Sequence, residues 1–154
     1  MTLRPEFKTY AAQVVSNAKA LAEALASHGF RVISGGTDTH VVLIDVFAAG
    51  AGMLGSEAEA ALGAAGITVN KNAIPYDTNP PLKPSGIRLG TPALTTRGMG
   101  EDEMRTIAGW VAEALTHRTD EARLRTLHGR VRELAEGFPL YGWLRHEETA
   151  GVLA

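Results

Sequence analysis

The sequence predicts a single α/β domain in which a small sheet is flanked by helices, one of them long. Apolar residues recur at spacings of three and four near both ends of the chain, as is typical of amphipathic helices. Short apolar runs bounded by glycine lie between them and indicate strands. A chain of 154 residues is long enough to bury one compact core, and too short for two of ordinary size.

The N-terminal helix is the longest predicted element. Pro5 suits its first turn and Gly29 suits its C-terminal end. At about 22 residues it would be about 33 Å long, which is long for so small a domain. We therefore expect one apolar face of this helix to be exposed in this chain and to pack against other protein. Its apolar stripe consists of Phe7, Tyr10, Ala11, Val14, Ala18, Leu21, Ala22 and Leu25.

Two strands are predicted after this helix. Residues 30–33 form the first, which ends in a turn at residues 35–38. Residues 41–46 form a mostly apolar run, and such runs are typical of strands that are buried on both faces. We therefore expect this second strand to lie in the middle of the domain.

A short helix and a third strand are predicted next. Ser56 and Glu59 have the spacing of a capping box, in which the two side chains satisfy free backbone donors at the start of a helix. Gly66 is expected to end this helix before a strand at residues 67–69. Prolines then recur through residues 73–85 and exclude regular structure there.

The last part of the chain predicts one strand and two helices. Residues 86–90 form the strand, and three acidic residues at 101–103 suit the first turn of the helix that follows. A final helix is expected to end at Gly137, and residues 142–154 are expected to be a weakly ordered tail. The apolar stripes of the two helices consist of Met104, Ile107, Val111 and Leu115, and of Leu124, Leu127, Val131 and Leu134.

Composition excludes several classes of function. The formal net charge is -2, and basic residues do not cluster with aromatic ones, so no nucleic-acid partner is expected. Cysteine is absent, which removes disulfides, thiolate metal sites and cysteine nucleophiles. No apolar run has the length of a membrane span, and the N-terminus has no signal-peptide core. We therefore expect a soluble cytoplasmic domain with no membrane partner.

Arg88 is the sharpest candidate for a binding residue. Alternation along the strand predicts Ile87 and Leu89 on one face and Arg88 on the other. A guanidinium held in this way can bind a carboxylate through two parallel hydrogen bonds. Gly86 and Gly90 favour a place where backbone approaches closely. The alternative is an ordinary exposed arginine on a sheet face.

Two further groups of polar residues have alternative interpretations. Asn70, Lys71 and Asn72 follow a predicted strand, and their amides can hydrogen-bond a heterocycle, although the residues alone favour turn chemistry. His40 precedes the most apolar strand and is interpreted as a structural group. The chain offers it no second and third ligand at metal spacing, so no metal site is predicted.

Several long sequence words closely resemble the C-terminal domain of bacterial serine hydroxymethyltransferase. The two most distinctive are TVNKNAIP at residues 68–75 and SGIRLGTPALTTRG at residues 85–98. The resemblance extends over about residues 3–141, and its other words are NAKALA at 17–22, SGGTDTH at 34–40 and GMGEDEM at 98–104. It implies the small α+β domain of a fold-type I pyridoxal-phosphate enzyme over residues 1–141.

The resemblance also implies roles for individual residues. The arginine of the family's Gly-Ile-Arg word binds the carboxylate of serine or glycine, which carries to Arg88. The segment before the Ser-Gly-Ile-Arg word lines the family's folate site, and this chain departs from the family's pattern there in two ways. Leu82 replaces the usual Phe, and Lys83-Pro84 replaces the usual Val-Thr. Loss of the aromatic face would weaken stacking on folate. The implied folate contacts are Asn72, Pro80, Pro81 and Leu82.

The cofactors of the complete enzyme would be pyridoxal phosphate and tetrahydrofolate. In the family, the lysine that forms the Schiff base lies upstream of this domain, and this chemistry requires such a lysine. We therefore expect the pyridoxal-phosphate-binding large domain to be absent, with no catalytic residue and no bound pyridoxal phosphate in this chain alone. The isolated chain would then be inactive. Its partners would be a large domain or a full-length homologue, in a homo-oligomer, together with serine or glycine and tetrahydrofolate.

Two alternatives stand beside this interpretation. The chain would be a non-catalytic truncated relative that binds or regulates a full-length partner, through the long first helix and the apolar residues 138–143. It would otherwise be a self-sufficient enzyme of another chemistry, for example one that binds folate or an amino acid. Nothing in the sequence supplies the acid, base or metal that the second alternative needs.

Overall fold

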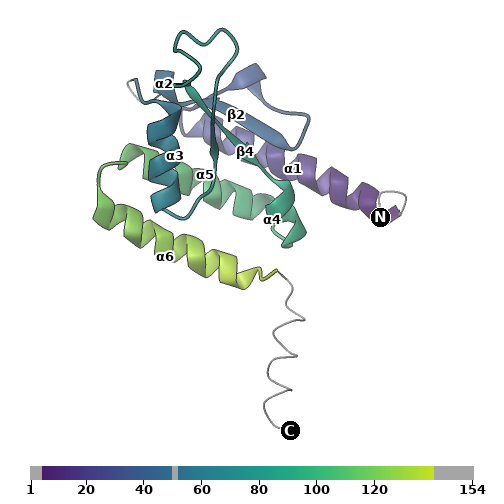
Figure 1. Cartoon of the computed structure of the whole chain (residues 1–154). Coiled ribbons are helices and arrows are strands. Elements are labelled where there is room, and N and C mark those ends of the chain that lie inside the picture. Colours follow the sequence, from purple (N-terminus) through teal and green to yellow (C-terminus); the bar gives the residue numbers. More distant parts are fainter. Residues whose placement is uncertain (1–4, 50–51, 141–154) are drawn as a thin grey trace.

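A four-stranded antiparallel sheet organises the domain, in a computed structural model that describes residues 5–49 and 52–140. The strand order is β1-β2-β4-β3, and every neighbouring pair is antiparallel. Helices flank this sheet, which confirms the predicted fold class (Figure 1). The strands are β1 Arg31–Val32, β2 Val41–Asp45, β3 Asn70–Asn72 and β4 Gly86–Gly90.

Helices make up most of the described chain. The two long helices α1 and α5 pack along each other beneath the sheet, and α3 packs against β3, α5 and α6 (Figure 1). Fully buried side chains from the sheet and these helices form one core, which includes Leu21, Ile44, Ile87 and Met104. The helices are α1 Pro5–Ser27, α2 Val46–Ala49, α3 Gly55–Ala64, α4 Pro92–Thr96, α5 Glu101–Thr116 and α6 Glu121–Gly137, with a 3-10 turn η1 at Ile33–Gly35.

The long first helix is confirmed, and its two halves differ in burial. Val14, Leu21 and Leu25 are buried in the core, whereas Phe7 is 37% exposed. The ring of Phe7 lies 5.9 Å from that of Tyr10, whose hydroxyl contacts α4. The helix ends before Gly29, which has a φ of +89°. The apolar stripe therefore reaches beyond the core at its N-terminal end.

The predicted burial of β2 on both faces is wrong. Val42 and Ile44 face the core and are fully buried, but Val41 and Leu43 on the other face are only half-buried. Antiparallel sheets can leave one face open to solvent, and this one does so at its centre. Asp45 at the end of β2 is nevertheless buried, where it accepts hydrogen bonds from Arg31 and from the backbone N–H of Ala48.

The first and third strands do not lie where the sequence predicts them. β1 is only two residues long because the chain turns into η1 at Ile33. Strand pairing of the third begins at Asn70, not at residues 67–69, because the N–H of Ile67 donates to Leu62 and closes α3. Gly66 adopts a φ of +80° at that helix end.

The predicted capping box at α3 is also displaced. The helix begins at Gly55, one residue before Ser56, and the side chain of Glu57 accepts from the N–H of Leu54. Glu59 instead accepts from the backbone N–H of Lys71 on β3. The short helix α4 was not predicted, because five residues are too few to show a helical period.

The remaining predicted elements agree with the structure. Residues 73–85 contain neither helix nor strand, and residues 86–90 form β4. The helix α6 ends at Gly137, where Arg97 donates to the carbonyl oxygens of Phe138 and Ala135. The predicted tail at residues 142–154 lies outside the described residues. None of the described helices is long and apolar enough to cross a membrane.

Candidate functional site

Arg88 lies at the centre of β4 on the open face of the sheet. It pairs in register with Leu43 on β2 and with Asn70 on β3. Its neighbours Ile87 and Leu89 are buried on the opposite face, as predicted. Within residues 5–49 and 52–140, the guanidinium of Arg88 forms no ion pair and no hydrogen bond. Its charge is therefore free to bind an anion.

Asn72 lies on the same open face, at the end of the neighbouring strand. It pairs with Gly86, while Asn70 two residues earlier pairs with Arg88. Cross-strand partners point to the same side of a sheet, so Asn72 is a diagonal neighbour of Arg88, at roughly 7–8 Å. The side-chain Nδ2 of Asn72 donates to the carbonyl of Ala73 at 2.6 Å, which is the local contact expected from turn chemistry. The structure therefore brings these two predicted site residues together.

Gly86 and Gly90, at the two ends of the strand that carries Arg88, differ in whether the structure requires a glycine. A Cβ on Gly86 would lie 2.8 Å from the carbonyl oxygen of Ile44 and 2.9 Å from that of Asn72, so both neighbouring strands require glycine there. At Gly90 the nearest atom would be 3.7 Å away, an ordinary contact. The close backbone approach predicted from these glycines is confirmed at Gly86, where the chain's own strands cause it.

The loop at residues 73–85 connects Asn72 to β4 and is built around the carboxylate of Asp77. Its Oδ2 accepts from the N–H groups of Ile74 at 3.2 Å and Ser85 at 3.0 Å. Its Oδ1 accepts from the N–H of Asn79 at 3.0 Å and from the hydroxyl of Ser85 at 2.5 Å. The Asn79 amide also donates to the Ser85 hydroxyl at 2.9 Å. One carboxylate therefore joins the start, middle and end of the loop.

These hydrogen bonds set the charge state of Asp77. Partial burial alone would raise its pKa, but hydrogen bonds from Ser85, Asn79 and Ile74 stabilise the ionised form and lower the pKa to about 2. Asp77 is therefore ionised at neutral pH. Asp77 was not among the site residues predicted from the sequence, although an Asp that opens an Asp-Thr-Asn-Pro stretch is a typical turn signal.

The three predicted folate residues of the loop are exposed. Pro80, Pro81 and Leu82 all face solvent, and the side chain of Leu82 is 89% exposed. Tyr76 on the same loop is fully exposed and has a φ of +58°. The loop projects from the end of the sheet at which β3 and β4 meet it (Figure 1). These residues therefore lie on the segment that joins Asn72 to Arg88.

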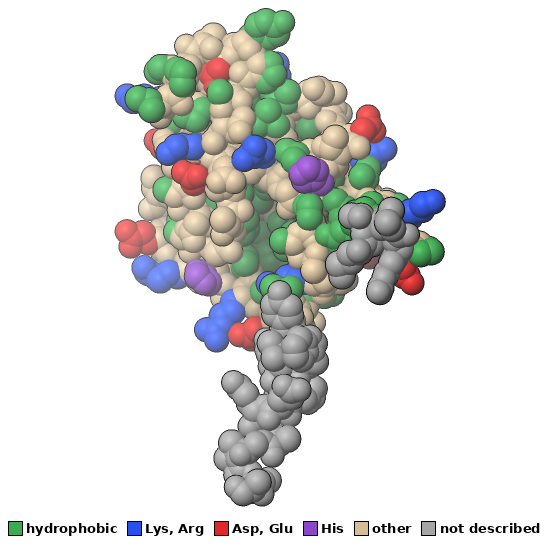
Figure 2. Space-filling model, turned by 45° about the vertical axis from the view of Figure 1, so that its right-hand side comes forward, with side chains coloured by type: hydrophobic (Ala, Val, Ile, Leu, Met, Phe, Trp, Pro, Cys, Tyr) green, Lys and Arg blue, Asp and Glu red, His purple; other side chains and the backbone are tan. Residues whose placement is uncertain are grey.

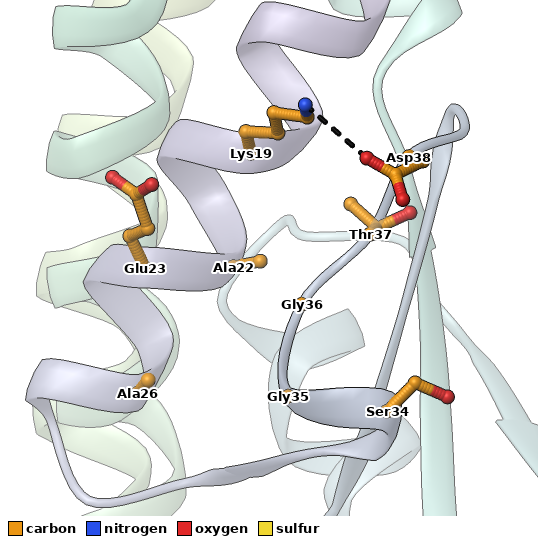
Figure 3. A pocket seen from close by; sticks show the side chains of 9 residues that line it. All are labelled: Lys19, Ala22, Glu23, Ala26, Ser34, Gly35, Gly36, Thr37 and Asp38. Atoms are coloured by element: carbon orange, nitrogen blue, oxygen red, sulfur yellow. Dashed lines mark ion pairs between the residues drawn. The ribbon is translucent and has the colours of Figure 1, made fainter.

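A cavity of about 700 Å³ lies elsewhere, between α1 and the loop that carries Gly35 and Gly36 (Figure 3). Lys19 on α1 reaches across it to Asp38 with an ion pair of 3.2 Å. Both side chains are mostly exposed, so this pair contributes little to stability. No predicted site residue lines the cavity, and its opposite charges already face each other. The open sheet face is therefore the better candidate site.

The sequence predicts neither a metal site nor a polyanion partner. Among the residues that the structure describes, no three His, Asp or Glu side chains gather as metal ligands. His40 is exposed, and its backbone carbonyl accepts from the N–H of Thr91. On the face shown in Figure 2, basic and acidic side chains alternate without forming a patch of one sign.

Fold and site together define a small α+β domain whose open sheet face presents a free arginine beside a side-chain amide. The chain belongs to the serine hydroxymethyltransferase family, because the model of the family described as "Serine hydroxymethyltransferase" matches residues 1–111. That match includes β1 to β4, the loop at residues 73–85 and Arg88.

Curated relatives agree with this assignment. The chain is 70% identical over 148 residues to a serine hydroxymethyltransferase of Acidobacterium capsulatum, covering 96% of this chain and 34% of the relative. It is 68% identical over 150 residues to one of Koribacter versatilis, covering 97% of this chain and 35% of the relative. The chain therefore spans about a third of the length of these relatives.

Proposed function

We propose that this chain provides the substrate-carboxylate clamp and part of the folate site of a serine hydroxymethyltransferase. In that reaction serine and glycine are interconverted and a one-carbon unit is transferred to tetrahydrofolate. The observation that carries the proposal is the free, exposed guanidinium of Arg88 at the centre of the open sheet face. The names of the relatives, at 70% and 68% identity, support the reaction.

Arg88 would act by binding and orienting the amino-acid substrate. A guanidinium donates two parallel hydrogen bonds to a carboxylate, which fixes the plane of that group as well as its position. Arg88 would donate these hydrogen bonds and take no part in proton transfer. Its contribution would be the alignment of the substrate with the reacting groups.

The folate would bind beside this clamp. The Oδ1 of Asn72 accepts no hydrogen bond among the described residues, so the amide can receive one from a heterocycle. Pro80, Pro81 and Leu82 offer an exposed apolar surface on the adjoining loop. Leu82 provides no aromatic face, so we expect it to contribute contact area without ring stacking.

We propose that the site for pyridoxal phosphate is formed mainly outside this chain. This cofactor supplies an electron sink that stabilises a carbanion on the substrate, and the resting enzyme holds it on a lysine. Lys19 and Lys71 are half exposed and face the carboxylates of Asp38 and Glu59. We therefore place the cofactor's lysine in another part of the enzyme or in another chain, and expect the isolated chain to be inactive.

The test is conversion of serine to glycine with pyridoxal phosphate and tetrahydrofolate. The chain is assayed alone and together with the N-terminal two thirds of the Acidobacterium capsulatum relative, expressed separately. The positive control combines that N-terminal part with the relative's own C-terminal third. We expect turnover only in the combined samples. Activity of the isolated chain, or no activity with this chain when the positive control is active, would contradict the proposal.

A second candidate function is a regulatory module that binds a full-length homologue. Phe7 at the start of α1 and Leu140 after α6 are large apolar side chains with 37% and 46% exposure, which favours a protein contact. Size-exclusion chromatography of the chain with the full-length relative distinguishes this role. A complex that changes the rate of the full-length enzyme supports it, and separate elution removes it. The same experiment reports whether the chain forms a homo-oligomer.

A further inference from the structure

A single side chain contacts the start, the middle and the end of the loop at residues 73–85. Asp77 contacts Ile74 near the start of the loop, Asn79 in the middle and Ser85 at the end. Ser85 is 2% exposed and is itself fixed, since its carbonyl accepts from the N–H groups of Val46 and Phe47 on α2. The carboxylate therefore ties the middle of a proline-rich segment to a buried, hydrogen-bonded residue of the fold.

We infer that Asp77 is a positioning residue that sets the place of residues 80–82 relative to Asn72 and Arg88. This inference rests on the proposed function. Asp77 acts through hydrogen bonds inside the loop, from the backbone of Ile74 and Asn79 and from Ser85. Residues 80–82 lie between Asn79 and Ser85, the two residues that donate to the same carboxylate oxygen, Oδ1.

The chemistry of the site requires a carboxylate at position 77. Three backbone N–H groups and one hydroxyl all donate to it, so an acceptor on both oxygens is needed. The ionised state that these donors favour is the only one with that capacity. In an Asp77→Asn variant one oxygen becomes an NH₂ group that faces N–H donors, so part of the set is lost with almost no change of shape.

Loss of hydrogen bonds to Asp77 should affect the binding of tetrahydrofolate and of serine differently. Arg88 is held by the pairing of β4 with β2 and β3, which does not involve Asp77. Residues 80–82 have no strand or helix to hold them, although the N–H of Lys83 does donate to the carbonyl of Pro80. Loosening the loop therefore disorders the proposed folate contacts of residues 80–82 and leaves Arg88, the carboxylate clamp, in place.

The experiment measures KM for tetrahydrofolate and for serine separately, in the full chain combined with the N-terminal part of the relative. For Asp77→Asn we expect KM for tetrahydrofolate to rise about tenfold, while KM for serine stays within about twofold of wild type. The matched control is Asp38→Asn, an equivalent change in another exposed loop, which should alter neither KM. Ser85→Ala removes the hydroxyl group, which donates to Asp77 and accepts from the Asn79 amide, but keeps the three backbone donors to Asp77. It should therefore produce a smaller change in the same direction.

Each outcome decides the matter. Inactive wild-type chain in an assay whose positive control works overturns the proposed function and this inference together. An active wild type with unchanged folate KM in both Asp77→Asn and Ser85→Ala overturns the inference alone. Equal rises in both KM values would show a general structural role and also overturn it. If Asp77→Asn does not fold by circular dichroism, the Ser85→Ala variant provides the same comparison between the two ligands.

Discussion

Arg88 owes its position to its two neighbours on β4 and to the strands that pair with it. Ile87 and Leu89 are buried on one face, which forces Arg88 to the other, and pairing on both sides prevents β4 from twisting away. This arrangement was predictable because alternation is a local property of the sequence. The pairing of Asn70 with Arg88 was not predictable, because the register of β3 depends on where the preceding helix and turn end.

The first prediction concerns the geometry of the Arg88 guanidinium. Arg88→Lys keeps the positive charge and loses the paired donors that match a carboxylate. In the two-part enzyme we expect KM for serine to rise about ten- to hundredfold, as for loss of a charged hydrogen bond. Arg31→Lys is the control, since Arg31 lies on the same sheet but already pairs with Asp45 at 3.2 Å. An unchanged KM for serine in Arg88→Lys would remove Arg88 from the proposed clamp.

The second prediction follows from the pKa of Asp77. Its value of 3.8 in the unfolded chain falls to about 2 in the folded protein, so the unfolded state binds more protons between these values. The stability that Asp77 provides is therefore fully present above about pH 4 and is lost as pH falls through 2. The difference in free energy of unfolding between wild type and Asp77→Asn should shrink from pH 5 to pH 2 in denaturant titrations. A difference that is constant over this range contradicts the assignment.

At the scale of elements, the wrong predictions for β3 and for the start of α3 have the same cause. Ile67 and Val69 have strong strand propensity, but the N–H of Ile67 is used to close α3 and pairing begins only at Asn70. Ser56 and Glu59 have the spacing of a capping box, but Glu57 accepts the capping hydrogen bond, from the N–H of Leu54, two residues earlier in the chain. In both cases a contact between elements outweighed a local preference.

The third prediction concerns the packing of β4 between its neighbours. Gly86→Ala places a Cβ within 2.9 Å of backbone oxygens of both β2 and β3, neither of which can move without breaking the sheet. We expect it to lower the free energy of unfolding by about 1–3 kcal/mol. Gly90→Ala at the other end of the strand meets nothing closer than 3.7 Å and should change stability by less than about 0.5 kcal/mol. Equal stabilities of the two variants in urea titrations would show that β4 is not confined in this way.

At the scale of the whole molecule, the sequence predicted which segments are helix and sheet better than it predicted how they join. The core residues of α5 were identifiable from their period, and Met104, Val111 and Leu115 are buried as expected. The attachment of α6 was not identifiable. Of its apolar stripe only Leu124 and Leu127 are buried, and no local pattern links its far end to Arg97, the residue that follows α4.

The last prediction tests this attachment. The terminal carbonyls of a helix lack partners within the helix, and Arg97 satisfies those of Ala135 and Phe138 from another element. Without it, the second half of α6 is held by half-buried Val131, Leu134 and Phe138 and by the surface pair of Arg130 with Glu113. Arg97→Ala should therefore increase hydrogen exchange at residues 131–138 while residues 121–127 stay protected, at a total cost of about 1–3 kcal/mol. Arg132→Ala, which removes only a surface pair with Glu136 on the same helix, should leave exchange nearly unchanged. If both variants exchange alike, α6 is held along its whole length by its apolar contacts, and the arginine is dispensable to the fold.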